Sequence, residues 1–262
     1  MTQQGGSPPR IGVDIGGTFT DVVLEKGTAR YTAKVLTTPR APEQGVGQGI
    51  QGVLADSGVA PGEVALIIHG TTLATNALIE RKGVATALVT TQGFRDSIEM
   101  GSESRFEQYD INMEKPLPLV PRRRRFAVAE RLNAAGEVIL ALDEAAVAAL
   151  IAPLKALEVE SVAIGFLHSY VNPAHEQRAY EILSAGLPDV TFTLSSEVAP
   201  EMREYERFST ACANAYVQPI MAQYLRRLEA GLKDQGFTCP LFVMLSGGGV
   251  ADIETGIRFP IR

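Results

Sequence analysis

Residues 10–21 read RIGVDIGGTFTD, and this stretch decides the fold of the chain. Apolar residues occupy every second position from 11 to 15, which is typical of a strand. The glycines at 16 and 17 predict a tight turn, and residues 19–24 predict a returning strand. Residues 31–36 predict a third strand. The chain is therefore expected to begin with a hairpin sheet.

The turn in this hairpin has the residue types that suit the phosphate tail of a nucleotide. Glycine lets the backbone approach closely, so that N–H groups can point at phosphate oxygens. A carboxylate before the turn can hold Mg²⁺ through water, because this cation prefers carboxylate and phosphate oxygens. The alternative is an ordinary turn with capping threonines, but the acid on each side favours phosphate binding. The candidate residues of this turn are Asp14, Gly16, Gly17, Thr18, Thr20 and Asp21.

A second motif, residues 69–76 (HGTTLATN), begins as a loop after an apolar strand predicted at 64–68. The loop leads into a helix running to Lys82, and backbone N–H groups at a helix start can form an anion or oxyanion site. His69 could act there as an acid, a base or a metal ligand. The alternative is that Thr71 only caps the helix and that His69 is a hydrogen-bonded residue at a strand end. The spacing alone favours neither interpretation.

Helices and strands alternate along the rest of the chain. A helix at 42–57 and a strand at 85–89 complete the pattern of an α/β layer. A polar, extended stretch at 93–121 leads to a second run of the same kind, which forms either another subdomain or an insertion in the first. The elements predicted in this run are a hairpin of strands 126–132 and 137–140, a helix from Asp143, a strand at 161–167, a helix at 173–185 and a strand at 190–194.

The last part of the chain is predicted to begin with a long helix from Met202 that is bent or broken at Pro219. A strand at 241–245 follows, and then a glycine loop at 246–249 that could admit a phosphate or a ribose or be a plain turn. The predicted domains are a flexible tail at 1–9, a phosphate-loop lobe at 10–92, a second α/β subdomain at 93–195 and a last segment at 196–262.

Composition excludes several classes of protein. The 262 residues carry a net charge of −6, which argues against a nucleic-acid partner. No stretch resembles a secretory signal or a membrane span, so we expect a cytoplasmic protein with no membrane contact. The arginine run at 122–125 and the mixed-charge segment at 201–207 are expected to be solvated surfaces. The G-x-G-x-x-G letters at 47–52 fall inside a predicted helix and not after a strand, so they do not indicate a dinucleotide site.

In its strand–turn–strand setting, the opening motif resembles the first phosphate loop of the actin, Hsp70 and sugar-kinase superfamily. The rest of the chain resembles the N-terminal part of the hydantoinase A / 5-oxoprolinase family, which includes N-methylhydantoinases, 5-oxoprolinases and acetone or acetophenone carboxylase subunits. The blocks that carry this resemblance are RIGVDIGGTFTD at 10–21, HGTTLATNALIERKG at 69–83, LVTTQGFRD at 88–96, LVPRR at 119–123, LHSYVNPAHE at 167–176 and residues 200–216. The family typically has Gln-Ser-Asn-Gly-Gly where this chain has Leu-Ser-Gly-Gly-Gly at 245–249, so the two amide side chains of the family's loop are missing here.

The resemblance implies a ribonuclease H-like α/β lobe of the actin type, with 10–195 as the N-terminal region of the family and 196–262 as an incomplete hydantoinase A domain. Family members are several hundred residues longer and carry a second phosphate loop. The chain is therefore expected to be truncated at its C-terminus, to hold half of a two-lobed site and to be inactive alone.

The resemblance also implies the chemistry. ATP with Mg²⁺ would phosphorylate a carbonyl oxygen of a cyclic amide, after which water opens the ring. Asp14 would serve the Mg²⁺ ion and the transferring phosphoryl group, and Gly16, Gly17 and Thr18 would contact phosphate, supported by Thr20 or Asp21. A catalytic role for His69, and contacts of Thr71, Thr72 and Asn76 with the substrate or the cleft, complete the expected site.

Several functional alternatives remain open at this point. The chain could belong to an ATP-dependent ketone carboxylase of the same family, to a sugar-type kinase, or to a non-catalytic interaction module. The resemblance implies a small-molecule substrate and a hydantoinase B-type partner subunit. It leaves open whether the chain forms a homo-oligomer and which hydantoin, oxoproline or ketone it serves.

Overall fold

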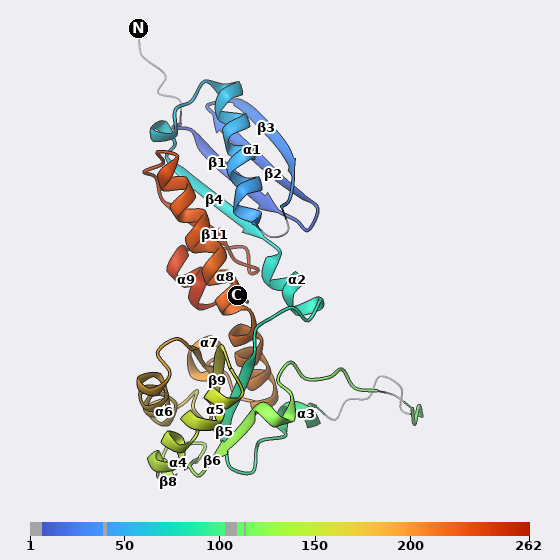
Figure 1. The fold of residues 1–262 in the computed structure, drawn as a ribbon, viewed down its shortest axis with the longest axis vertical. Helices are drawn as coiled ribbons and strands as arrows, with labels where there is room; N and C mark the ends of the chain where they lie inside the picture. The colour runs from blue at the N-terminus through green and yellow to red at the C-terminus, as the bar shows by residue number, and fades with distance from the viewer. Residues whose placement is uncertain (1–6, 39–40, 103–108, 113) are drawn as a thin grey trace. The chain divides into compact units, whose positions relative to one another are not determined.

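The computed structural model describes residues 7–38, 41–102, 109–112 and 114–262. Two compact units form within them (Figure 1). The first comprises Met1–Lys82 and Ile220–Arg262, and the second comprises Gly83–Pro219, so the second unit is an insertion in the first. Residues 1–6 of the predicted tail at 1–9 lie outside the described residues. The predicted extended stretch lies outside them at 103–108 and 113.

A mixed six-stranded sheet forms the first unit, in the order β12-β11-β4-β1-β2-β3. Its first three strands pair antiparallel in chain order, as the opening motif predicted. Strand β4 lies parallel to β1 on one side and to β11 on the other. The bounds are β1 (Arg10–Ile15), β2 (Phe19–Lys26), β3 (Ala29–Leu36), β4 (Leu66–Thr71), β11 (Leu241–Met244) and β12 (Val250–Asp252).

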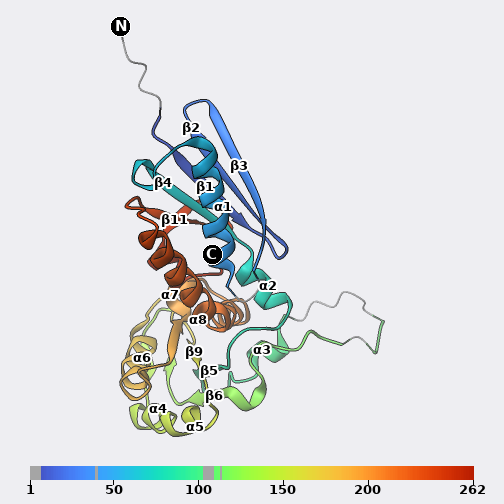
Figure 2. The ribbon, with the colours of Figure 1, turned by 45° about the horizontal axis from the view of Figure 1, so that its top comes forward.

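Helices cover one face of this sheet. Helix α1 (Pro42–Ser57) lies across β1, β2 and β3 in both views (Figures 1 and 2), and the apolar face of this helix is buried against them. Helix α9 (Ile253–Arg258) and residues of the C-terminal half of α8 (Glu204–Asp234) join the same core. Along β1 the odd-numbered apolar residues point into this core, so Asp14 points to the other face.

Strand β4 differs from its prediction at 64–68. It begins later and continues to Thr71, because β1 remains paired with it up to Ile15. His69, Gly70 and Thr71 are therefore strand residues, and the prediction that they form a loop is wrong. Helix α2 (Leu73–Ile79) is also shorter than predicted. It ends before Arg81, which adopts a left-handed φ of 56° that a helix cannot continue.

The second unit is built on a parallel four-stranded sheet in the order β10-β9-β5-β6. Three helices, α4, α5 and α6, pack their apolar side chains on one face of it. Strand β5 was predicted within the first lobe, but it pairs with β6 and β9 and so belongs here, which moves the boundary to residues 82 and 83. The bounds are β5 (Thr86–Thr91), α3 (Ser97–Met100), β6 (Arg125–Val128), β7 (Arg131–Leu132), β8 (Val138–Leu140), α4 (Glu144–Ala149), α5 (Ile151–Ala156), β9 (Ser161–Gly165), α6 (Ala174–Gly186), β10 (Thr191–Leu194) and α7 (Ser195–Val198), with 3-10 turns at Pro61–Glu63 and Arg122–Arg124.

Two predicted elements of this unit are divided in the structure. The predicted strand at 126–132 consists of β6, which joins the parallel sheet, and β7, which forms the predicted hairpin with β8. The predicted helix from Asp143 consists of α4 and α5, which meet at Leu150. Pro153 lies in the first turn of α5, where its missing N–H breaks no hydrogen bond within that helix.

Helix α8 runs through Pro219, so of the predicted bend or break the break does not occur. A proline removes the N–H donor of its own turn and crowds the preceding turn. The carbonyl of Tyr216 in that turn accepts a hydrogen bond from Val84 N–H at 3.0 Å, so a residue outside the helix contacts the turn before the proline. Among the described residues, no helix has both the length and the apolar character needed to cross a membrane.

Two arginines that were expected on solvated surfaces are buried in the second unit. Arg125 is 2% exposed and forms an ion pair with Glu99 at 2.6 Å. Arg207 is 1% exposed and donates hydrogen bonds to the carbonyl oxygens of Phe166 and Glu201 and to Ser195 Oγ. The prediction was wrong for both, because tertiary acceptors that are distant in sequence compensate for the removal of these cations from water.

Candidate functional site

The predicted phosphate turn forms a tight hairpin between β1 and β2. Gly16 N–H donates to the carbonyl of Phe19 at 2.9 Å and closes the turn. The carbonyl oxygens of Gly16 and Thr18 both accept hydrogen bonds from Thr37, one from its hydroxyl and one from its N–H, each at 2.9 Å. Within the described part of the chain, the N–H groups of Gly17 and Thr18 donate no hydrogen bond. The turn therefore offers two exposed amide donors to an incoming anion.

Asp14 belongs to a row of residues that crosses four strands on the face of the sheet away from the helices. Its neighbours in register are Gly70 on β4 and Asp21 on β2, and Asp21 is in turn opposite Lys34 on β3. Lys34 Nζ donates to both carboxylate oxygens of Asp21 at 2.7 Å. No hydrogen bond or ion pair from another described residue reaches the Asp14 carboxylate. Asp14 is thus the free carboxylate of the row, and Asp21 is neutralised by its partner.

The second motif reaches the phosphate turn directly. Thr72 N–H and the Thr72 hydroxyl both donate to the carbonyl of Ile15, at 3.2 and 3.3 Å. Asn76 Nδ2 donates to Thr72 Oγ1 at 3.3 Å and lies 3.6 Å from the position that a Cβ on Gly17 would occupy. The structure therefore brings Thr72 and Asn76 to the turn across more than fifty residues of sequence.

Thr71 has a local role at the start of α2. Its hydroxyl accepts a hydrogen bond from Leu73 N–H at 3.1 Å, while Thr72 occupies the N-cap position without a capping bond from its own side chain. Helix α2 has only seven residues, so its dipole adds little to anion binding at this end. Any contribution of this motif to binding therefore rests on its side chains.

Asp14, Thr71 and Thr72 meet where the chain order of the sheet reverses. After β1 the chain adds β2 and β3 on one side, and then crosses to add β4 on the other side. In sheets with parallel strands, ligands bind outside the carboxyl ends of the strands at such a switch point. A cavity of about 310 Å³ opens there, lined by Asp14, Gly70, Thr71, Thr72, Thr75 and Ser246 among others. A hollow of about 880 Å³ on the face that bears Asp14 also includes Asp14 and Gly70, so this carboxylate borders both spaces.

His69 lies apart from these residues because it points to the opposite face of the sheet. It is fully buried in the core, where its Nε2 hydrogen-bonds to Tyr224 Oη at 2.8 Å. Burial lowers the pKa of His69 to about 4 and raises the pKa of Tyr224 above its ordinary value. In this conformation His69 is a neutral link between β4 and α8. Its catalytic role stays a prediction.

Thr20 is also enclosed. Its side chain has no exposed surface and lies 3.1 Å from Thr37 Oγ1, hydroxyl to hydroxyl. Sequence reasoning missed both Thr37, which holds the turn, and Lys34, which neutralises Asp21. Thr37 follows a strand and matches no phosphate motif, so no signal in the sequence could have identified it.

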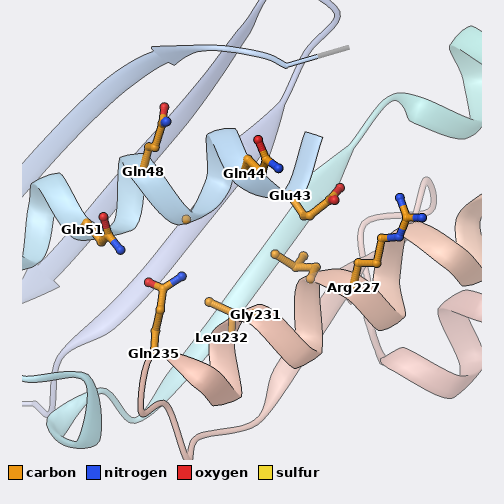
Figure 3. A pocket seen from close by; sticks show the side chains of 10 residues that line it. Glu43, Gln44, Gln48, Gln51, Arg227, Gly231, Leu232 and Gln235 are labelled. Carbon is orange, nitrogen blue, oxygen red and sulfur yellow. The ribbon is translucent and has the colours of Figure 1, made fainter. Parts of the chain in front are cut away.

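Other features of the described chain do not add to this site. A groove of about 330 Å³ between α1 and α8 is lined by Glu43, Arg227 and several glutamines, and Figure 3 shows these side chains along its two walls. It includes none of the predicted site residues. Among the described residues, no three His, Cys, Asp or Glu side chains are grouped so that they could hold a metal ion. A cation at Asp14 would therefore need ligands from the nucleotide and water.

Comparison with known proteins agrees with the fold and with the position of the motifs. Residues 10–187 match the family model "Hydantoinase/oxoprolinase N-terminal region", and residues 207–262 match the model "Hydantoinase/oxoprolinase". The solved structure of the ATP-dependent caprolactamase from Pseudomonas jessenii superposes with a TM-score of 0.84 and 37% identity, over 92% of this chain and 36% of that one. A nucleotide-free acetone carboxylase superposes with a TM-score of 0.86 at 24% identity, over 96% of this chain and 38% of that one, and shows the shared fold. The fold is an α/β fold of the actin type, as predicted.

Sequence relatives give the same result. The chain is 38% identical to the caprolactamase subunit alpha of P. jessenii, over 92% of this chain and 36% of the relative. It is 32% identical to the acetophenone carboxylase gamma subunit of Aromatoleum aromaticum, over 93% of this chain and 36% of the relative. It is also 32% identical to the 5-oxoprolinase of Saccharomyces cerevisiae, over 93% of this chain and 22% of the relative. The chain thus spans little more than a third of these relatives at most, and it belongs to the hydantoinase/oxoprolinase family.

Proposed function

We propose that this chain provides the phosphate-binding lobe of an ATP-dependent enzyme that hydrolyses a cyclic amide. One observation carries the proposal: the unpaired Asp14 carboxylate lies beside a glycine turn whose Gly17 and Thr18 N–H groups make no internal hydrogen bond. A polyphosphate offers both the oxygen acceptors for these amides and the charge that a Mg²⁺ ion at Asp14 would balance.

The residues present fit ATP with Mg²⁺. The amides of Gly17 and Thr18 would bind phosphate oxygens, and the exposed Thr18 hydroxyl would add a donor. Asp14 would hold Mg²⁺ through water. Asp21 would support the site without binding the ion, because its carboxylate is already paired with Lys34. When bound, Mg²⁺ supplies neutralisation of phosphate charge during transfer. Thr71 and Thr72 would border the cleft in which the substrate lies, and Asn76 would act on this cleft through its hydrogen bond to Thr72.

The proposed reaction uses one ATP and two waters for each ring opened. The carbonyl oxygen of the amide attacks the γ-phosphorus, the bond from phosphorus to the bridging oxygen breaks, and ADP leaves. Water adds to the activated carbon, the C–N bond breaks as nitrogen takes up a proton, and an acyl phosphate remains. A second water releases phosphate and leaves the ring-opened amino acid. In this scheme the lobe contributes positioning and charge stabilisation, which account for most of the catalysis of phosphoryl transfer.

The relatives support ATP use and separate subunits more strongly than they support one substrate. The caprolactamase and acetophenone carboxylase relatives are named as alpha and gamma subunits, which favours a partner subunit, proposed here to be of the hydantoinase B type. A ketone carboxylase is the second candidate function, favoured by the similarity to the acetophenone carboxylase subunit. Both candidates use the same phosphate turn and differ in the group that ATP activates.

The first test is calorimetry of Mg·ATP binding to the 262-residue chain and to Asp14→Asn. We expect the variant to lose the dependence of binding on Mg²⁺ while its unfolding temperature stays the same. Asp56→Asn makes the same change of charge at an exposed position near the end of α1 and is the matched control. If Asp14→Asn and Asp56→Asn bind Mg·ATP equally well, Asp14 has no part in nucleotide binding.

A second measurement separates the candidate functions. With the partner subunit present, phosphate release should depend on an added lactam if the protein is a cyclic amide hydrolase, and on a ketone with bicarbonate if it is a carboxylase. Phosphorylation of an added sugar would instead identify a kinase. If nucleotide fails to bind under any of these conditions, even when the chain is extended to include the second phosphate loop expected of the family, the proposal is refuted.

A further inference from the structure

Thr37 lies just after β3 and makes three hydrogen bonds to the phosphate turn and its flank. Its hydroxyl donates to the carbonyl of Gly16 at 2.9 Å, and its N–H donates to the carbonyl of Thr18 at 2.9 Å. Its hydroxyl oxygen also lies 3.1 Å from Thr20 Oγ1. One residue thus contacts both ends of the turn and the first buried polar side chain of β2.

The direction of these bonds follows from the chemistry of a hydroxyl, which has one proton to donate. Thr37 gives that proton to the Gly16 carbonyl, so Thr20 must donate to Thr37. The result is a short chain of hydrogen bonds from Thr20 through Thr37 to Gly16. Thr20 is fully buried, so it depends on Thr37 as the acceptor for its proton.

This chain of hydrogen bonds determines where the Gly17 amide points. The peptide bond between Gly16 and Gly17 is trans, so its carbonyl and its N–H point in opposite directions. Holding the Gly16 carbonyl toward Thr37 therefore turns the Gly17 N–H away from Thr37. Glycine has a wide range of backbone angles, so without this restraint the Gly16–Gly17 peptide could rotate.

We infer that Thr37 is the positioning residue of the phosphate turn, holding the Gly17 amide in the orientation that binds a phosphate oxygen. This inference rests on the proposed function, because it assigns a purpose to the ordered turn. Thr72 acts from the other side by binding the Ile15 carbonyl, so the turn is restrained at both of its flanks. Thr37 itself touches no ligand in this scheme.

Three variants separate positioning from mere stability. Thr37→Val removes the hydroxyl at nearly constant volume and should weaken Mg·ATP binding about tenfold, the effect expected from freeing one or two restraining hydrogen bonds. Thr37→Ser keeps the hydroxyl and should bind within about twofold of the parent chain. Thr38→Val is the matched control, because the Thr38 side chain makes no hydrogen bond within the described residues.

The double variant Thr20→Val/Thr37→Val provides the decisive comparison. Thr37→Val alone leaves the buried Thr20 hydroxyl without a partner and should lower the unfolding temperature. Replacing both hydroxyls removes that penalty, so the double variant should recover its unfolding temperature. If Thr37 has a purely structural role, the double variant should recover its Mg·ATP affinity together with its unfolding temperature. If Thr37 is a positioning residue, the double variant should still bind Mg·ATP about tenfold more weakly than the parent chain, because the Gly16 carbonyl has no hydrogen-bond partner.

The outcomes distinguish this inference from the proposed function. Equal affinities of the parent chain and Thr37→Val for Mg·ATP would overturn the inference and leave the proposed function unaffected. If the parent sequence binds no nucleotide, either alone or within a longer chain that carries the second phosphate loop expected of the family, the proposed function fails. The positioning of the turn is then judged by NMR: the backbone order parameter of Gly17 should fall from about 0.85 to below 0.6 in Thr37→Val. An unchanged order parameter would overturn the inference independently of any ligand.

Discussion

Acidification should destabilise this chain in part through the buried His69, and replacing that residue should remove this part of the effect. His69 lies fully buried between β4 and α8, with Tyr224 Oη as its hydrogen-bond partner at 2.8 Å. Burial lowers its pKa from 6.5 to about 4, because the charged imidazolium would lose its hydration in the core. In the unfolded chain the same side chain is hydrated and titrates near its ordinary pKa.

The magnitude follows from the difference between these two pKa values. Above pH 6.5 the histidine is neutral in both states, and its contribution to the free energy of unfolding is fully present. Between pH 6.5 and 4 the unfolded state binds the proton more tightly, so the folded state loses stability as the pH falls. One pKa unit corresponds to about 1.4 kcal/mol, so the loss reaches about 3 kcal/mol near pH 4 and grows little below that.

The assay is urea denaturation followed by circular dichroism at half-unit steps from pH 7.5 to 4. Carboxylates also titrate in this range, so the informative quantity is the difference in unfolding free energy between the parent chain and His69→Gln. Glutamine keeps a hydrogen-bond partner for Tyr224 but does not titrate. The stability advantage of the parent chain should shrink by about 3 kcal/mol from pH 7 to 4. The variant His168→Asn removes a histidine from the other unit and should retain this loss. The reasoning would be refuted if the unfolding free energies of the parent chain and His69→Gln differ by a constant amount, within about 0.5 kcal/mol, from pH 7 to 4. It would also be refuted if the advantage of the parent chain grows on acidification.

Two further substitutions test the packing of the second unit. Gly83→Ala should cost about 1–3 kcal/mol of unfolding free energy, because the new Cβ would lie 2.1 Å from ring atoms of the buried Tyr216. At Gly62, the new Cβ would meet no atom of the described residues within 4 Å apart from its chain neighbours, so Gly62→Ala should be nearly neutral. Equal effects of the two changes in a thermal melt would contradict this packing. Arg207→Met should cost about 3–5 kcal/mol, because the carbonyls of Phe166 and Glu201 would lose their donor in a buried site. Replacement of the exposed Arg226 by Met should cost less than about 1 kcal/mol of unfolding free energy. If chemical denaturation shows similar losses for both variants, the buried hydrogen bonds of Arg207 do not stabilise the unit.

Much of the first unit could be predicted because its signals are local. The alternation at 11–15 and the glycines after it determine a hairpin within twelve residues, and the structure confirms β1, β2 and β3 in that order. The face of α1 follows from helical periodicity in the same way. Prediction was less accurate where an element depends on a distant partner. Strand β4 extends to Thr71 because β1 pairs with it, and β5 belongs to the second unit because β6 and β9 flank it.

Part of the candidate site could likewise be predicted from local sequence, and the rest depends on contacts between distant residues. The residue types at Asp14, Gly17 and Thr18 indicate phosphate chemistry from the sequence alone, because a carboxylate, a flexible turn and a hydroxyl are adjacent in the chain. The sequence predicts both motifs separately, but the proximity of the phosphate turn to Thr72 and Asn76 depends on the parallel pairing of β1 with β4.

Side-chain direction and burial were decided only by the tertiary structure. His69 and Gly70 are adjacent in sequence, yet one points into the core and the other lies beside Asp14, because successive residues of a strand face opposite sides. Arg125 and Arg207 are buried because acceptors from other elements surround them, and Thr37 restrains the phosphate turn although it matches no phosphate motif. The sequence by itself determined which chemical groups this protein carries and the hairpin that presents them. Pairing between distant strands decided which of those groups meet, since hydrogen bonds of that kind depend on contacts that no local pattern specifies.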